Sequence, residues 1–257
     1  MATGLLVICI GRATKQVDTL MAQHKEYTGT MRLGQATPSQ DADTEVCEEA
    51  PWEHVTDADL AAAATAFVGE IQQVPPMYSA IRVGGTRLYE AARAGVEVER
   101  SARSVTVTEL ELTRDAACPR DVHFRVACSK GTYVRTLAHD LVRVGVIMAA
   151  QCCSSNGIQS YMHEHIQQQV FGSTDDDASQ GLHLGSRAHL TALRRTQNGE
   201  QHVERAWALG PLLDALSALE LPERRTSRKG GGRRGGDRRQ KKKLRQDVNA
   251  LHEPRQE

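Results

Sequence analysis

Positive charge is concentrated in one short segment of this chain, and that segment limits where a folded domain can lie. Residues 223–245 hold twelve of the 32 Lys and Arg residues but only two of the 32 Asp and Glu residues, a net charge of +10. The rest of the chain carries −10, so the formal net charge of zero is a cancellation. The segment has Gly-Gly spacers and almost no apolar side chains, and therefore cannot offset its ordering entropy by burial. We expect disorder from about Leu221 onward.

A mobile basic arm suits the phosphate backbone of a nucleic acid, because counterion release drives such binding and salt weakens it. We therefore expect residues 222–257 to contact RNA, although a solubilising or nuclear-targeting tail would have the same composition. The side chains expected to contact RNA are those of Arg233, Arg234, Arg238, Arg239, Lys241, Lys242 and Lys243.

The 257 residues suffice for one large domain or two small ones with a buried core. A helix that spans a membrane needs about 20 consecutive apolar residues. The longest apolar run, residues 5–10, is far shorter. A membrane protein is therefore not expected.

Cysteine and histidine spacing gives no metal-site pattern. The six cysteines include no C-x-x-C pair, and reduced thiols in an intracellular compartment are expected. Cys128 lies in an alternating strand pattern, which predicts a core position. His163-Glu164-His165 has the i, i+2 spacing of a metal pair on a strand, yet no third ligand is evident. No metal site is expected.

Apolar periodicity predicts several elements in the first half of the chain. Residues 13–22 have helical spacing, and residues 27–33 form a strand pattern that enters a turn at Gly34. Thr56 begins a capping-box-like sequence ahead of an alanine-rich helix through Phe67. Residues 74–79 contain Pro-Pro and should be extended. A glycine pair then precedes a short helix at 87–94.

The next segments add strands and a further helix. Val105 and Val107 alternate with polar residues, and then Leu110 and Leu112 alternate in the opposite phase, which predicts a β-bulge between them. Residues 123–127 alternate as well, and a helix follows Gly131-Thr132. Strands of antiparallel type mixed with scattered helices indicate an α+β fold. One terminal helix is expected at 207–221.

Five segments in order resemble sequence blocks of the tRNA pseudouridine(55) synthases of the bacterial TruB type. K-E-Y at 25–27, L-G-x-x-T-x-x-x-D-A-D at 33–43 and K-G-T-Y-V-R at 130–135 lie within them. The resemblance implies a pseudouridine synthase core, with a mixed, mainly antiparallel sheet flanked by helices. Five blocks in family order are specific, whereas a lone K-G-T-Y would mean little. The segments are 2–15, 25–43, 74–95, 128–141 and 185–199.

The chain departs from the family pattern at its catalytic motif. The family's nucleophilic aspartate lies in a G-T-L-D-P motif, which by this resemblance falls two residues upstream of Met1. Residues 1–257 contain no such motif, so the chain as given is expected to be inactive. Arg135 resembles the arginine that pairs with this carboxylate, and it is expected to lack that partner. Asp41 and Asp43 align with a different family loop, and neither is expected to substitute.

A second departure lies at residues 142–180, which have no sustained period and contain a Cys-Cys pair, a Gln triplet and an Asp triplet. When residues 142–180 are left out and Leu141 is joined directly to Gly181, the sequence resembles the family without interruption. The segment has a whole number of codons, and Val142 and Gln180 suit the ends of an intron that is read through in frame. The hypothesis is a retained intron, and the alternative is a genuine surface insertion.

The resemblance implies a reaction that needs no cofactor and no metal. Uracil leaves C1′, rotates and is rejoined through C5, after a carboxylate attacks and the uridine leaves its stack. Tyr27 is implied as the ring that stacks on the base and removes the C5 proton, with Tyr133 and Leu193 lining the pocket. Lys25 and Arg194-Arg195 are either phosphate contacts or surface charge.

These features define three parts. Residues 1–141 and 181–221 form a partial catalytic domain, 142–180 an insertion, and 222–257 a basic tail, where bacterial relatives usually carry an RNA-binding PUA domain. The implied function is isomerisation of the T-loop uridine in the tRNA T-arm by a monomer. The alternative is a catalytically inactive RNA-binding or tRNA-chaperone protein. An intracellular setting is expected, and the sequence does not distinguish plastid or mitochondrion from nucleus or cytoplasm.

Overall fold

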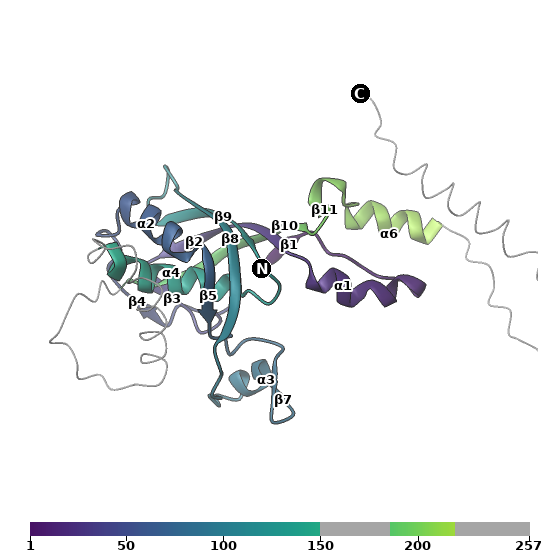
Figure 1. The fold of residues 1–257 in the computed structure, drawn as a ribbon, viewed down its shortest axis with the longest axis horizontal. Helices are drawn as coiled ribbons and strands as arrows, with labels where there is room; N and C mark the ends of the chain where they lie inside the picture. Colours follow the sequence, from purple (N-terminus) through teal and green to yellow (C-terminus); the bar gives the residue numbers. More distant parts are fainter. Residues whose placement is uncertain (150–185, 219–257) are drawn as a thin grey trace, which may run out of the picture. The chain divides into compact units, whose positions relative to one another are not determined.

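The computed structural model describes residues 1–149 and 186–218 (Figure 1). The chain divides into two compact units, Met1–Ala206 and Trp207–Glu257. The predicted basic tail and the His163-Glu164-His165 cluster lie outside the described residues, as does most of the predicted insertion. In the second unit, the predicted terminal helix is present as α6 (Leu209–Ala218).

A seven-stranded sheet forms the centre of the first unit. Its strand order is β1-β10-β2-β9-β8-β5, and β11 pairs with β10. Only β1 and β10 pair in parallel, and every other pairing in the sheet is antiparallel. The predicted α+β class and mainly antiparallel sheet are confirmed. The strands are β1 (Ala2–Gly4), β2 (Lys25–Leu33), β5 (Gly69–Gln73), β8 (Arg103–Arg114), β9 (Asp121–Cys128), β10 (Ala188–Asn198) and β11 (Gln201–His202).

Smaller elements lie between these strands. Two short ladders join β3 (Gln35–Ala36) to β4 (Glu48–Glu49) and β6 (Arg82–Val83) to β7 (Thr86–Arg87). The predicted helix at 13–22 begins as a 3-10 helix and becomes α-helical only in its second half. Among the described residues of the unit, the helical elements are η1 (Gly11–Gln16), α1 (Val17–Ala22), α2 (Asp57–Phe67), α3 (Leu88–Arg93), α4 (Val134–Ala149) and η2 (Val203–Arg205).

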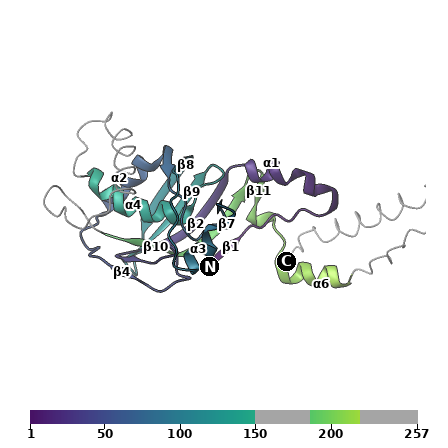
Figure 2. The same cartoon turned by 90° about the horizontal axis from the view of Figure 1, so that it is seen from below.

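The hydrophobic core lies on one face of the sheet, where α2 and α4 pack against each other and against the strands (Figure 2). Phe67 of α2 and Leu137 of α4 are almost fully buried there with Met31 of β2. Because side chains alternate along a strand, Tyr27 and Met31 face the helices while Thr28 and Thr30 face away. The sheet therefore has one covered face and one polar face.

Local sequence signals explain two of these elements. The Thr56 hydroxyl accepts a hydrogen bond from the Asp59 backbone N–H, and the Asp59 carboxylate accepts one from the Thr56 N–H, which is the predicted capping box of α2. In β8, the register against β9 shifts between Val107 and Glu109. This shift confirms the predicted bulge, and it lets Val107 and Leu110 both face the core.

Helix α4 continues beyond the position at which the insertion was predicted to begin. It runs from Val134 to Ala149, and Val142 is only 2% exposed. Residues after Leu141 have no sustained period that predicts a regular element, so this extension was not expected. Residues 150–180 lie outside the described part, and both hypotheses for the insertion stay open.

Gly29 lies in β2 where there is no space for a side chain. A Cβ at this position would overlap with the Ala192 carbonyl oxygen and the Phe124 ring. We expect Gly29→Ala to lower the free energy of unfolding by about 1–3 kcal/mol, since overpacking forces neighbours to shift. Urea unfolding measures this effect. Thr28→Ala, on the polar face of the same strand, is the control and should cost less than about 1 kcal/mol.

Candidate active site

The loop that follows β3 folds around the buried carboxylate of Asp41, which is 5% exposed. Its Oδ1 accepts hydrogen bonds from the Ser39 hydroxyl and from the Asp43 backbone N–H at 3.0 Å. The Thr37 hydroxyl donates to the Asp41 carbonyl oxygen at 2.7 Å. The loop is therefore closed by its own Thr, Ser and Asp side chains, which are typical turn residues.

Arg135 joins this loop to two other parts of the fold. It lies in the first turn of α4, and its Nη1 donates to Asp41 Oδ2 at 3.0 Å and to the Ser39 carbonyl oxygen at 2.9 Å. Its Nη2 donates to the Tyr78 carbonyl oxygen at 2.7 Å. One guanidinium group thus connects α4, the Asp41 loop and the segment after Pro75-Pro76. Such charge-assisted bonds are stronger than neutral ones.

Arg135 therefore has a carboxylate partner in Asp41, a residue that was not expected to pair with it. The expected absence of the G-T-L-D-P aspartate beside Arg135 stays a prediction. Asp41 and Arg135 are 94 positions apart, and only the docking of the loop on α4 brings them together. The D-A-D motif offered candidates, but sequence spacing could not show which carboxylate would face the helix.

Further contacts anchor the loop. Gln40 has a left-handed backbone conformation, with φ of 61°. Its carbonyl oxygen accepts a hydrogen bond from the Leu190 N–H of β10, and its Oε1 accepts one from the Thr136 hydroxyl of α4. The strain of a left-handed non-glycine residue is sustained by these fixed partners. The loop is held against both β10 and α4.

Tyr27 lies in β2, directly opposite Arg195 of β10 and Val126 of β9, and it packs against the core cluster. Burial raises the pKa of the Tyr27 phenol and the nearby Cys128 thiol raises it further, whereas Arg195 lowers it. Cys128 is itself 1% exposed, which confirms its predicted core position. Within the described residues, no hydrogen bond joins Tyr27 to Arg135.

The other two predicted pocket residues lie on different elements. Tyr133 immediately precedes α4 and is partly buried, and both polar groups of its backbone bond to the Gln73 side chain. Leu193 of β10 lies opposite Gly29 of β2 and packs partly against the core. The roles implied for these side chains stay predictions.

The basic residues near the sheet have distinct environments. The Lys25 ammonium donates to the carbonyl oxygens of Met21 and Gln23, each at 2.6 Å, and so closes the end of α1. Burial lowers the pKa of Lys25, and the Arg195 charge lowers it further. Arg195 Nε donates to the Leu5 carbonyl oxygen at 2.7 Å, whereas Arg194 is exposed. Arg194 is thus better placed than Lys25 or Arg195 for a phosphate contact.

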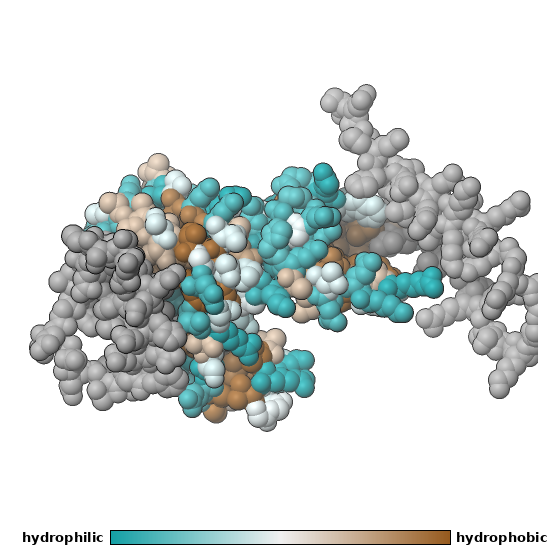
Figure 3. Space-filling model, viewed as in Figure 1, coloured by the Kyte–Doolittle hydropathy of each residue, from teal (hydrophilic) through white to brown (hydrophobic). Residues whose placement is uncertain are grey.

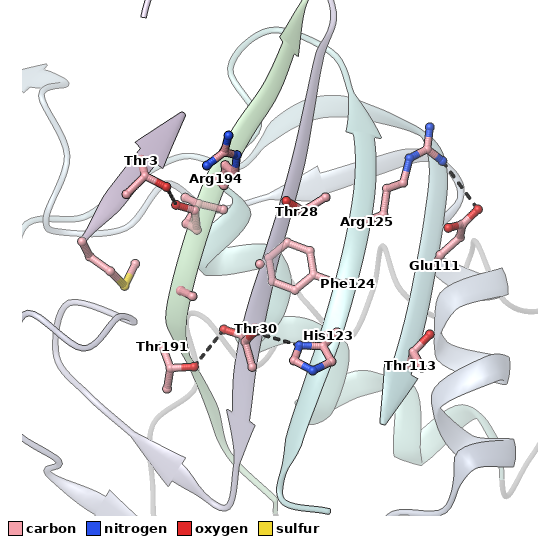
Figure 4. Close-up of a pocket in the computed structure, with 14 residues that line it drawn as sticks. Thr3, Thr28, Thr30, Glu111, Thr113, His123, Phe124, Arg125, Thr191 and Arg194 are labelled. Carbon is pink, nitrogen blue, oxygen red and sulfur yellow. Dashed lines mark hydrogen bonds and ion pairs between the residues drawn. The ribbon is translucent and has the colours of Figure 1, made fainter. Parts of the chain in front are cut away.

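A cavity of about 570 Å³ lies on the polar face of the sheet (Figure 4). Thr28, Thr30 and His123 line it, and the Thr30 hydroxyl lies 3.0 Å from His123 Nδ1. These side chains point away from the helices, whereas Tyr27 points towards them. Neither Asp41 nor Arg135 lines the cavity, although the predicted pocket residue Leu193 does. Threonines on an exposed strand face are ordinary for β-structure.

Met1, the residue before β1, lies close to the Asp41 loop. The Met1 amino group is 3.5 Å from Asp43 Oδ1, two residues from Asp41. Thr3 and Gly4 then pair with Arg194 and Arg195 of β10. The chain thus enters the sheet from beside the loop that holds Arg135.

Two absences concern only the described parts of the chain. Within residues 1–149 and 186–218, no group of three or more His, Cys, Asp or Glu side chains could hold a metal ion. Over the same residues, no helix is long and apolar enough to cross a membrane.

Comparison with known proteins identifies the family of this chain. Residues 1–134 match the TruB family pseudouridylate synthase N-terminal domain. The chain is 42% identical over 223 residues to tRNA pseudouridine synthase B of Opitutus terrae, covering 87% of this chain and 74% of the relative. It is 39% identical over 206 residues to the protein of that name from Flavobacterium johnsoniae, with 80% and 72% covered. The chain belongs to the TruB family of pseudouridylate synthases.

Other matches cover smaller shares of the similar protein. The tRNA pseudouridine synthase B of Levilactobacillus brevis is 54% identical over 144 residues, which are 54% of this chain and 48% of the relative. Among solved structures, a chain of a Cbf5-Nop10-Gar1 complex is 23% identical, with a TM-score of 0.47. That match covers 84% of this chain and 43% of the other.

Proposed function

We propose that this chain is the catalytic part of an isomerase that converts the T-loop uridine of tRNA to pseudouridine. Membership of the TruB family carries the proposal. The Arg135 network supports it, because that arginine is held in one orientation by three acceptors at the start of α4. A fixed guanidinium group can hold a catalytic carboxylate ionised and oriented.

Tyr27 supplies the proposed stacking surface and proton acceptor for the flipped uridine. Its phenol has a raised pKa because of burial, so it is protonated before the substrate binds. Tyr27 can accept the C5 proton only as the phenolate, so in the proposed mechanism its own phenol proton passes to solvent first, and the neighbouring Arg195 favours the phenolate. Arg195 therefore assists Tyr27 in the proposed mechanism.

Asp41 is not the proposed nucleophile. One of its carboxylate oxygens accepts two hydrogen bonds and the other pairs with Arg135, so its lone pairs are engaged and its side chain is buried. We propose instead that the family aspartate of the G-T-L-D-P motif attacks the substrate. A residue joined to Met1 would enter beside Asp43, in the loop whose Asp41 pairs with Arg135. Residues 1–257 alone would then lack the nucleophile.

Release of tritium from uridine labelled at C5 tests the proposed reaction. The substrate is a T-arm RNA with the label at a single T-loop position, and the enzyme is the chain extended upstream through G-T-L-D-P. Release from the T-loop, with none from RNA labelled in the stem, supports the proposal. Equal release from both RNAs, or none from either, contradicts it.

A second candidate function is tRNA binding or chaperoning without catalysis. The observation that favours it is the Asp41–Arg135 pair, which satisfies the charge of Arg135 without any further carboxylate. An extended chain that binds the T-arm and releases no tritium would support this alternative.

Arginines on a separate lobe support an RNA partner. The lobe of β6, β7 and α3 carries apolar patches bordered by polar side chains (Figure 3). Arg82 and Arg93 are exposed on it, and the Arg87 and Arg93 guanidinium groups lie 5.8 and 5.4 Å from the centre of the Tyr89 ring. Exposed arginines held beside an aromatic ring suit contacts with phosphates and bases.

Removal of residues 222–257 should weaken binding to a T-arm RNA and flatten its salt dependence. Each phosphate contact that is lost lowers the slope of log Kd against log salt concentration by about 0.7–0.9. Filter binding at several salt concentrations measures both effects. Removal of 246–257 alone, which spares residues 223–245, is the control. An unchanged slope after the longer deletion would show that the tail does not contact RNA.

An intracellular setting is also proposed. The cysteines of the described residues, Cys9, Cys47, Cys118 and Cys128, are all free thiols, as expected in a reducing compartment. A monomer remains part of the proposal, and gel filtration of the full chain tests it.

A further inference from the structure

Gln73 makes an unusual pair of contacts for the last residue of a strand. Its side chain lies in the interior, and the residue is only 2% exposed. Gln73 Nε2 donates to the Tyr133 carbonyl oxygen at 3.1 Å, and Gln73 Oε1 accepts from the Tyr133 backbone N–H at 2.7 Å. Both polar groups of one residue's backbone are thus satisfied by a single amide side chain.

The segment that Gln73 holds is the entry to the Arg135 site. Gly131, with φ of 84°, turns the chain after β9, and Tyr133 comes directly before α4. The Tyr133 carbonyl oxygen also accepts the Leu137 N–H, so it lies at the first turn of the helix. Arg135 follows two residues later. Fixing both backbone groups of Tyr133 therefore fixes the direction in which α4 begins.

At neutral pH an amide suits this position better than leucine or glutamate. Leucine would leave a buried donor and a buried acceptor without partners, which carries the full desolvation penalty of both. An ionised glutamate could accept from the Tyr133 N–H but would place a second acceptor against the Tyr133 carbonyl. A protonated glutamic acid could again donate to that carbonyl.

We propose that Gln73 is a positioning residue for the uridine pocket, which acts through Tyr133 and Arg135 and does not touch the substrate. The inference rests on the proposed function, because the pocket is the one assigned to the T-loop uridine. Gln73 lies 60 positions from Tyr133 in the sequence, and it forms a bond between the β5 end of the sheet and the start of α4.

The test measures the preference of the 1–257 chain for uridine without requiring catalysis. Kd is determined for a T-arm hairpin with uridine at the target position and for the same hairpin with an abasic site there. The uridine preference is the Kd of the abasic hairpin divided by the Kd of the uridine hairpin. In Gln73→Leu we expect this ratio to fall by about tenfold, or about 1.4 kcal/mol. Amide hydrogen exchange of Tyr133 shows in parallel whether its backbone bond is lost.

Two further variants separate positioning from a general loss of stability. Gln197→Leu removes another glutamine whose Nε2 donates to a backbone carbonyl, that of Gly199, in the β10–β11 hairpin. It should leave both the uridine preference and the Tyr133 exchange unchanged. In Gln73→Glu the uridine preference should be lost at pH 8, where the new carboxyl group is ionised. At lower pH this group becomes protonated, and the preference should then return towards that of the unsubstituted chain at the same pH.

Retained uridine preference in Gln73→Leu, despite faster exchange at Tyr133, would overturn the proposal and leave Gln73 with a structural role only. An equal loss in Gln197→Leu would overturn it as well. If the unsubstituted chain shows no preference for uridine, the proposed function fails and the inference falls with it. A loss of uridine preference that is confined to the Gln73 variants supports the inference and is consistent with the proposed function.

Discussion

Arg135→Met is expected to lower the free energy of unfolding by about 3 kcal/mol, because removal of the partly buried guanidinium group leaves the buried Asp41 charge uncompensated. The Asp41 carboxylate would remain buried without its guanidinium partner. The carbonyl oxygens of Ser39 and Tyr78 would also lose their donor. This decrease in the free energy of unfolding should exceed the decrease caused by substitution of any exposed arginine of this chain. Urea unfolding measures it.

The double variant Arg135→Met with Asp41→Asn is the matched control. Once the carboxylate is neutral, the missing arginine should cost less, so the double variant should be more stable than Arg135→Met alone. Arg125, which is more exposed than Arg135 and pairs with glutamates on the polar face, gives the comparison. A cost below about 1 kcal/mol for Arg135→Met, the range of surface pairs, would contradict the buried network described above.

Local signals predicted much of the fold. The strand at 27–33, the helix capped by Thr56 and the bulge in β8 each arise from a few neighbouring residues. Period-2 and period-3.6 patterns are readable for such elements because burial on one face selects apolar residues at fixed spacing. The capping box is equally local, since Thr56 and Asp59 satisfy each other.

The contacts that build the site are not local, and the sequence did not reveal them. Asp41 reaches Arg135 and Gln73 reaches Tyr133 only after the sheet and α4 have docked. The sequence also did not predict which face of β10 Arg194 and Arg195 occupy. Bulges in β10 shift its register on either side of these residues and reset the alternation of its faces. A family resemblance identified Arg135, but the geometry supplied its partner.

The second large expected effect concerns catalysis. Residues 1–257 should show no release of tritium from C5-labelled T-loop uridine, because Asp41 is engaged by Arg135 and no G-T-L-D-P aspartate is present. Extension upstream through that motif should give activity. The effect should be close to all-or-none, since loss of the nucleophile removes the covalent step. Substitution of the motif aspartate by asparagine in the extended chain is the control.

Tritium release by three forms of the chain on one T-arm substrate therefore shows which carboxylate attacks the uridine. We expect release by the extended chain, and none above background by residues 1–257 or by the Asp→Asn form. Release by residues 1–257 would instead mean that a carboxylate already within this chain performs the attack.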